Sequence, residues 1–339
     1  MSETYDEPNG YESYNNTHRA FLQALLARQS ITLPEAKPIL SSILTAHTPD
    51  RPTLEQDVSP EDFENYIHSL NASISPFDLE IRSTLHQVTR DQTWALVNVA
   101  SDALMQMSTT FSADEIAFVK RVLDAMFETY NTPRAEIMAI TSMQAVRYAK
   151  PSSSDTSRRD SGTQSTQQQS STTGLSVHQA EKVLEVLENE GWFERSKRGY
   201  YTLTPRALME LRTWLVETYN STDDDSDAEE ESHVKIKMCQ ACKEIVTVGQ
   251  RCPNLVCEAR AHEHCLRNLW RSQGGMEECP VCKTGWMEGP PVGERAARGE
   301  VGAQRGGGRR RTGGGRRSTG LGMSMNGAGD EEDDGDASE

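Results

Sequence analysis

The sequence of 339 residues is long enough for two or three domains, and its low hydrophobic content of 35% predicts that part of it lies outside any packed core. The N-terminus is polar and acidic, and no apolar run approaches the ~20 residues of a membrane helix, so we expect a soluble intracellular protein. The formal net charge of −16 argues against a surface uniformly suited to nucleic acid. Much of that charge lies in two acidic blocks, Asp223–Glu231 and Asp330–Asp336, which are typical of solvated spacers.

After a polar segment, 1–15, for which we expect disorder, residues 16–110 show the element order of a winged helix. Apolar residues at helical spacing predict three amphipathic helices, and two short runs of strand-forming residues predict a hairpin after them. The predicted helices begin at Asn16/Thr17, span Pro34–Ala46, and run from Ser59-Pro60 to Leu70; the predicted strands are Phe77–Ile81 and Trp94–Val99. Three helices followed by a hairpin predict winged helix A.

The same order recurs over residues 111–220, interrupted by a Ser/Thr/Gln tract, 151–174, that is too polar to fold. The predicted elements are a helix after the capping box Ser112–Glu115, a helix opened by Pro133 that carries Ile137, Ile140 and Val146, a helix from Ser176 to Gly191, strands at Trp192-Phe193 and Tyr200–Leu203, and a closing helix Pro205–Tyr219. We interpret this segment as winged helix B with a disordered insertion between its second and third helices.

The charge of winged helix B favours protein docking over DNA binding. Its third helix carries four glutamates and a single lysine, which is a poor match for a phosphate backbone. Only the turn between its strands is basic, so Arg195, Lys197 and Arg198 are the candidates for a weak DNA contact.

An acidic linker, 221–234, precedes a module, 235–288, that contains all seven cysteines. Disulfides are rare in reducing compartments, so this clustering favours metal binding. Four closely spaced pairs supply eight ligands for two tetrahedral zinc ions, and such closed sites are structural because no position remains for a catalytic water. The candidate ligands are Cys239, Cys242, Cys252, Cys257, His262, Cys265, Cys279 and Cys282. His264 is an alternative to His262, although the spacing His262-x2-Cys265 favours the latter.

Residues 289–339 are Gly- and Arg-rich and then acidic, and we expect them to be disordered. The run Arg309-Arg310-Arg311 suits nuclear import or sequence-independent nucleic-acid contact. A tail with no dedicated role fits the composition equally well.

The ligand order of four cysteines, one histidine and three cysteines is similar to that of both RING and PHD fingers. The run Cys279-Pro280-Val281-Cys282 is typical of RING fingers, as are the large apolar residues that follow Cys265 at helical spacing. PHD fingers usually carry a tryptophan two residues before the seventh ligand, where this chain has Glu277. We therefore favour a RING finger. In either family the first and third ligand pairs share one ion, which implies one site of Cys239, Cys242, His262 and Cys265 and another of Cys252, Cys257, Cys279 and Cys282.

Resemblance to RING fingers implies a ubiquitin ligase that positions a charged conjugating enzyme, because no cysteine remains as a nucleophile. The candidate docking surface comprises the first zinc loop at Gln240/Ala241 together with Leu269, Trp270, Pro280 and Val281. Lys283 occupies the place of the cation that bridges ubiquitin and the conjugating enzyme in active RING fingers. Since lysine lacks the planar fork of arginine, we expect weak intrinsic activity. Packing of Trp270 inside the finger and a solvated Lys283 are the alternatives.

Two winged helices followed by this finger resemble the first non-SMC element family, RING-finger subunits of the SMC five–six chromosome-maintenance complex. The likeness spans about residues 16–288 and is carried by Ala180–Trp192, Glu217–Tyr219 and the ligand string, although the gap from Cys252 to Cys257 is longer than the family's usual two residues. It implies a nuclear subunit that docks a MAGE-type partner beside the kleisin subunit and acts in DNA repair and recombination. A non-catalytic scaffold and a chromatin- or DNA-binding protein are the alternative functions.

Overall fold

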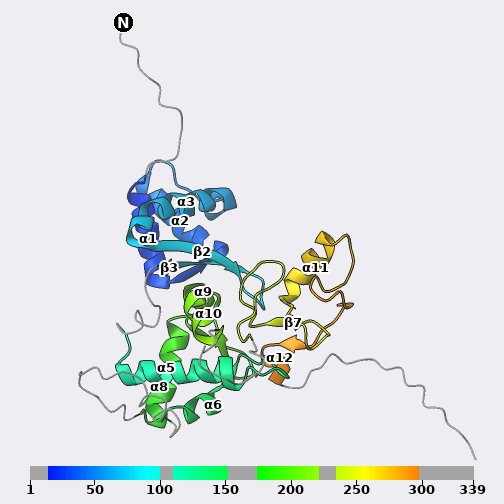
Figure 1. Cartoon of the computed structure of the whole chain (residues 1–339). Coiled ribbons are helices and arrows are strands. Elements are labelled where there is room, and N and C mark those ends of the chain that lie inside the picture. The colour runs from blue at the N-terminus through cyan, green and yellow to red at the C-terminus, as the bar shows by residue number, and fades with distance from the viewer. Residues whose placement is uncertain (1–13, 100–109, 152–173, 221–233, 298–339) are drawn as a thin grey trace, which may run out of the picture. The chain divides into compact units, whose positions relative to one another are not determined.

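The computed structural model describes residues 14–99, 110–151, 174–220 and 234–297 (Figure 1). Most of the N-terminal segment, the Ser/Thr/Gln insertion and the acidic linker lie outside these ranges, as does the tail with Arg309-Arg310-Arg311. Among the described helices, none combines the length and the apolar character needed to cross a membrane.

Residues 14–99 form three helices against an antiparallel sheet of strand order β1-β3-β2. The elements are α1 (Asn16–Arg28), β1 (Ser30–Thr32), α2 (Leu33–His47), α3 (Pro60–Ile74), β2 (Leu79–Leu85) and β3 (Gln92–Asn98), with short 3-10 turns at Glu55–Asp57 and Ser75–Phe77. Asn15 caps α1 and Ser59 caps α3, each through a side-chain oxygen that accepts backbone N–H groups. The helices and the sheet share one apolar core, in which Phe63 meets Trp94 edge to face at 4.8 Å. The predicted helices and hairpin are present, whereas the winged-helix assignment stays a prediction.

Two details of this first part differ from the sequence prediction. Phe77 ends a 3-10 turn with 72% of its surface exposed, so the strand begins only at Leu79. Strand β1 was not expected, because three residues are too few to show the alternation of a strand. It pairs with β3, where Ile31 lies opposite Trp94.

Residues 110–220 repeat this arrangement around a sheet of order β4-β6-β5. The elements are α5 (Ala113–Asp124), which continues as a π-helix over Ala125–Thr129, β4 (Ile140–Thr141), α6 (Ser142–Arg147), α8 (Val177–Asn189), β5 (Phe193–Arg195), β6 (Tyr200–Leu203), α9 (Pro205–Glu210) and α10 (Arg212–Asn220). The predicted capping box at Ser112 and the predicted helix start at Ser176 are both present, the latter also as a capping box with Gln179, and Gly191 takes the left-handed φ of 69° after α8.

The helix predicted to open at Pro133 is wrong. Residues 131–136 instead close a turn, in which Thr132 and Ala135 exchange backbone hydrogen bonds and Asn131 forms a bridge with Glu136. Ile140 lies in β4 opposite Tyr201, and the helix that carries Val146 begins only at Ser142. Glu136 is 2% exposed and accepts hydrogen bonds from Lys237 and Arg260 of the zinc module. These contacts, which are distant in sequence, fix the turn. The single closing helix predicted over Pro205–Tyr219 is likewise two helices, with a break at Leu211.

The cysteine module is built on three very short strands, β7 (Gly249–Arg251), β8 (Arg260–Ala261) and β9 (Pro291–Val292), in the order β8-β7-β9. Helix α11 (Glu263–Ser272) follows β8, and α12 (Glu294–Ala297) follows β9. Residues 289–297, which we placed in the disordered tail, are therefore part of this module. Its apolar core is continuous with that of residues 110–220.

Gly249 is needed where β7 passes β8. A Cβ atom at this position would lie 2.4 Å from the carbonyl oxygen of Ala261, which is backbone and has little room to move. We expect Gly249→Ala to lower the free energy of unfolding of the module by about 1–3 kcal/mol, as overpacking does elsewhere. Gly285→Ala is the control, because its Cβ would meet nothing within 4 Å. Chemical denaturation of both zinc-loaded variants measures the difference, and equal stabilities would contradict the prediction.

Candidate metal centre

The structure brings the eight predicted ligands together in two groups of four. One group is Cys239, Cys242, His262 and Cys265, and the other is Cys252, Cys257, Cys279 and Cys282. Within each group the sulfur and nitrogen atoms all lie within 4.8 Å of one another. This is the interleaved grouping that resemblance to RING fingers implies.

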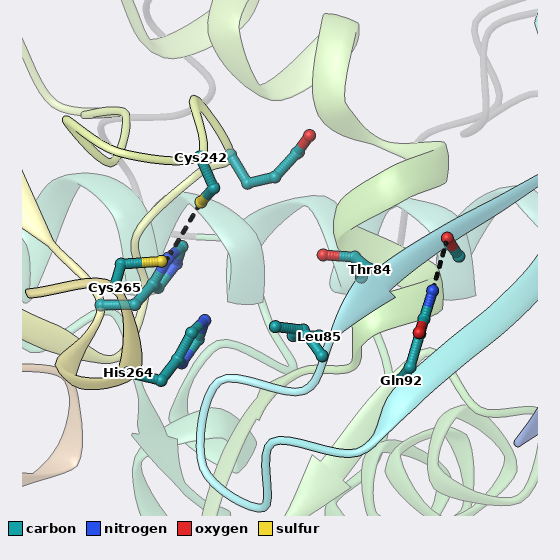
Figure 2. Close-up of a pocket in the computed structure, with 9 residues that line it drawn as sticks. Thr84, Leu85, Gln92, Cys242, His264 and Cys265 are labelled. Atoms are coloured by element: carbon teal, nitrogen blue, oxygen red, sulfur yellow. Dashed lines mark hydrogen bonds between the residues drawn. The ribbon is translucent and has the colours of Figure 1, made fainter. Parts of the chain in front are cut away.

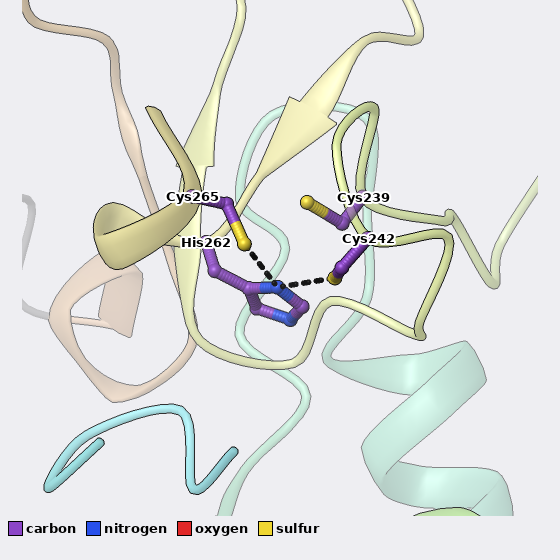
Figure 3. A group of neighbouring side chains, drawn as sticks. All are labelled: Cys239, Cys242, His262 and Cys265. Carbon is purple, nitrogen blue, oxygen red and sulfur yellow. Dashed lines mark hydrogen bonds between the residues drawn. The ribbon is translucent and has the colours of Figure 1, made fainter. Parts of the chain in front are cut away.

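In the first group, the ring of His262 faces the sulfur atoms (Figure 3). Its Nδ1 lies 3.3 Å from Sγ of Cys242 and 3.8 Å from Sγ of Cys265. Its Nε2 lies 3.2 Å from the carbonyl oxygen of Ile245, to which it can only donate. That hydrogen bond places the proton on Nε2 and leaves the lone pair of Nδ1 directed at the three sulfurs, which is the tautomer that a metal ligand requires.

His264 does not join the first group. Its ring stacks on that of His262 with centroids 5.1 Å apart and planes 3° from parallel. No described group hydrogen-bonds to its buried Nδ1. Of the two histidines, the geometry therefore favours His262 as the ligand.

The second group closes in the same manner. Sγ of Cys252 lies 3.4 Å from that of Cys282, and Sγ of Cys257 lies 3.7 Å from that of Cys279. A tetrahedral zinc with Zn–S and Zn–N bonds of about 2.0–2.3 Å separates its ligand atoms by roughly 3.5–3.8 Å. The observed distances and the sulfur-rich donor sets fit two zinc ions in a RING-like module.

The two Cys-x2-Cys loops that start at Cys239 and Cys279 share one backbone geometry. In each loop the residue after the second cysteine, Lys243 or Lys283, has φ of 62° and donates its N–H to the carbonyl of the first cysteine. The first cysteine in turn donates its N–H to the carbonyl of Glu244 or Thr284. Both sites are thus held by tight turns that position two sulfurs each.

The candidate docking residues differ in exposure. Val281 is 60% exposed, Ala241 and Lys283 are exposed, and Pro280 and Trp270 are half-buried. Leu269 is only 7% exposed and packs in the core of the finger. Nε1 of Trp270 is buried, and no described group hydrogen-bonds to it.

The basic turn of residues 110–220 is exposed but partly engaged. The guanidinium of Arg195 lies over the ring of Tyr201 at 5.7 Å, and Arg198 pairs with Glu294 at 3.8 Å. No described acidic residue forms an ion pair with Lys197.

A hollow of about 390 Å³ separates the first zinc group from the β2–β3 hairpin. Figure 2 shows the ring of His264 and the side chain of Leu85 on either side of it. It is lined by Ser83, Thr84, Leu85, Gln92, Cys242, Glu244, His262, His264 and Cys265.

Sequence reasoning missed a buried ion cluster that joins the finger to residues 110–220. Glu136 accepts hydrogen bonds from Nζ of Lys237 at 2.9 Å and Nε of Arg260 at 2.6 Å, and all three side chains are at least 93% buried. Burial opposes ionisation of Glu136, but the hydrogen bond and charge of Arg260, aided by Lys237, lower the pKa of its carboxyl to about 2. Nothing in a single sequence pairs a glutamate with cations more than a hundred residues away.

Comparisons with known proteins agree with this geometry. The family described as the Nse1 non-SMC component of the SMC5-6 complex matches residues 18–211, more than half of the chain, and a RING-like domain matches residues 239–282. The Homo sapiens protein "Non-structural maintenance of chromosomes element 1 homolog" is 21% identical over 80% of this chain and 84% of its own length. "Non-structural maintenance of chromosomes element 1" of Schizosaccharomyces pombe is 24% identical over 68% of this chain and 79% of its own.

A solved chain of an "Nse1-Nse3-Nse4 complex" has a similar fold, with a TM-score of 0.58 and 18% identity over 82% of this chain and 99% of that chain.

Proposed function

This chain belongs to the Nse1 family of non-SMC components of the SMC5-6 complex, and from that premise we propose that it is the RING-type ubiquitin-ligase subunit of such a complex. We place its action in the nucleus, in DNA repair and recombination. The observation that carries the ligase proposal is the pair of closed four-ligand groups, which present the two zinc loops of a RING-like module.

The chemistry of the proposed reaction follows from the use of the cysteines. All seven lie in the two groups, so none is left to accept ubiquitin as a thioester. Zinc ions held by the two groups would supply structural cross-links that fix the loops. The protein would act by holding a ubiquitin-charged conjugating enzyme in the orientation that brings its thioester to a substrate lysine.

The proposed docking surface lies on the two Cys-x2-Cys loops and α11. Val281 and Ala241 are exposed at the tips of the loops, and the half-buried Trp270 and Pro280 support this surface, while Leu269 packs beneath it. Lys283 is exposed, and no described acidic residue forms an ion pair with it. Its ammonium is therefore available to bridge ubiquitin and the conjugating enzyme.

We further propose that the two helical parts dock the neighbouring subunits, a MAGE-type Nse3 and the kleisin Nse4. The support is the similarity to a chain solved in an Nse1-Nse3-Nse4 complex. The acidic exposed face of α8, with Glu181, Glu185 and Glu188, favours protein over phosphate as the partner of this part of the chain.

An in-vitro ubiquitination assay tests the ligase proposal. With full-length protein, its Nse3-type partner and a panel of conjugating enzymes, we expect Val281→Ala to reduce chain formation by about tenfold, because one exposed apolar contact contributes about 1–2 kcal/mol to docking. Val256→Ala is the matched control, since Val256 is 90% exposed in the finger but lies outside the proposed surface.

Lys283 is tested in the same assay. We expect Lys283→Ala to lower the rate and Lys283→Arg to raise it, because arginine can bind two carbonyl oxygens at once. Val256→Ala is the control here too, because Val256 is exposed in the finger but lies outside the proposed surface. Complexes that assemble but make no chains with any conjugating enzyme would support a non-catalytic scaffold instead.

A further inference from the structure

The turn between β2 and β3 contacts the zinc module through the polar side chain of Gln87. Its Nε2 donates to the carbonyl oxygen of Ile245 at 2.9 Å. Its Oε1 accepts from the backbone N–H of Thr247 at 3.0 Å and of Val248 at 2.8 Å, and from the hydroxyl of Thr247 at 3.2 Å. Both ends of this amide are therefore hydrogen-bonded to a segment 158–161 residues away in sequence.

The carbonyl oxygen that Gln87 binds also binds a zinc-site residue. Ile245 accepts a hydrogen bond from Nε2–H of His262 at 3.2 Å, and this is the bond that directs Nδ1 toward the sulfurs. Ile245 is 2% exposed, so water has little access to its carbonyl oxygen and cannot easily replace either donor. A carbonyl oxygen has two lone pairs, and here the two donors occupy both.

The turn itself is held from its other side. Nε2 of His86 lies 2.7 Å from a carboxylate oxygen of Glu194 in β5, while its Nδ1 accepts from the N–H groups of Val88 and Thr89. These contacts of His86 hold the backbone next to Gln87 in place, independently of the hydrogen bonds that Gln87 makes to the zinc module. The side chain of Gln87 can therefore fix the position of residues 245–248, which follow the first zinc loop.

We propose that Gln87 is a positioning residue for the zinc site of Cys239, Cys242, His262 and Cys265, acting through the carbonyl of Ile245. The residue belongs to the hairpin of residues 14–99, whose apolar core is separate from the core that contains the finger. The geometry thereby makes retention of this zinc depend on the position of the first hairpin. Removing a group that orients a metal-ligating histidine typically lowers metal affinity by about 10–100-fold. Gln87 lies one hydrogen bond further from the histidine, so we expect its removal to change zinc retention by about three- to tenfold.

Zinc release from the full-length, zinc-loaded protein tests this proposal. The rate at which a colorimetric chelator removes each ion is measured for Gln87→Ala and Gln87→Glu. The glutamate keeps the shape and the acceptor oxygen Oε1 of Gln87, but it loses the donor to Ile245 and places a carboxylate oxygen against that carbonyl. We expect one of the two ions to leave about three- to tenfold faster in both variants, with increased hydrogen exchange at residues 239–248.

Val88→Ala is the matched control, because the side chain of Val88 is 61% exposed in the same turn. Hydrogen exchange of the β3 amides reports whether the hairpin still folds. If Gln87→Ala loses that protection, its hairpin no longer folds, and the proposal is then tested by zinc release from Gln87→Glu. Wild-type release from a folded Gln87→Glu would overturn the proposal, as would equal acceleration of both ions. No measurement here uses ubiquitin, so the result is independent of the proposed ligase activity.

Discussion

Replacing His262 by alanine is expected to remove one of two bound zinc ions, whereas replacing His264 is expected to leave both in place. The rings of these histidines are stacked and nearly parallel, so the two substitutions remove the same chemical group from neighbouring positions. Only His262 directs a ring nitrogen at the sulfurs, and its tautomer is fixed by the carbonyl of Ile245. Native mass spectrometry of the two variants counts the ions.

The loss of that ion should have a large effect on stability. Structural zinc contributes on the order of 10 kcal/mol per site at neutral pH, and the strands of this module are too short to persist alone. The apolar core of the finger is continuous with that of residues 110–220, so we expect unfolding to spread beyond the module. Near-ultraviolet circular dichroism and the unfolding midpoint of His262→Ala should both fall well below those of His264→Ala.

Thiol reactivity gives an independent check. Cys242 is exposed, so an unligated thiol at this position would react readily with an alkylating reagent. In the zinc-loaded wild-type protein we expect all seven cysteines to resist alkylation until a chelator is added. Free alkylation of Cys242 with two ions still bound, or two ions retained by His262→Ala, would contradict this assignment.

The parts of the fold that were predicted correctly are those fixed by local sequence. The capping box at Ser112 and the cap at Ser176 mark helix starts, because their hydrogen bonds span only three residues. The helix wrongly expected at Pro133 shows the opposite case. Pro133, Ile137 and Ile140 satisfy a helical pattern, but the backbone there follows the contacts of Glu136 with the zinc module and of Ile140 with Tyr201. Periodicity contains no information about either contact.

In the candidate site, too, the features that local sequence determines could be predicted and the contacts between distant segments could not. Its eight ligands follow from residue type and spacing, and their grouping follows from resemblance to a known cross-brace. The groups that orient the ligands could not be predicted, because the carbonyl of Ile245 belongs to the backbone and Gln87 reaches it from another part of the chain. Residues 289–297 join the module through the pairing of Val292 in β9 with Gly249 in β7. A two-residue strand is too short to show the alternation of residues that would predict it from the sequence.

The second large effect is expected at Glu136. Replacing it by glutamine keeps the shape of the side chain but leaves the buried cations Lys237 and Arg260 without their anion. Removing one partner of a buried ion pair typically costs about 3–5 kcal/mol, because the remaining charge stays desolvated. We therefore expect Glu136→Gln to lower the free energy of unfolding by about that amount and to loosen the finger from residues 110–220. Denaturant unfolding of the zinc-loaded protein measures the loss, and hydrogen exchange at β7 and β8 locates it.

The chain provides a matched control in the ion pair between Glu128 and Lys235. It joins the same two parts at 3.0 Å, but its side chains are 45% and 32% exposed. Water and mobile ions screen an exposed pair, so Glu128→Gln should cost no more than about 1 kcal/mol. The two variants share the acceptor, the substitution and a lysine donor, so the difference between them reports the burial of the cluster together with its second cation, Arg260. Equal small losses would mean that the finger is held by its apolar core and its zinc ions alone, and that the cluster around Glu136 only fills space between them.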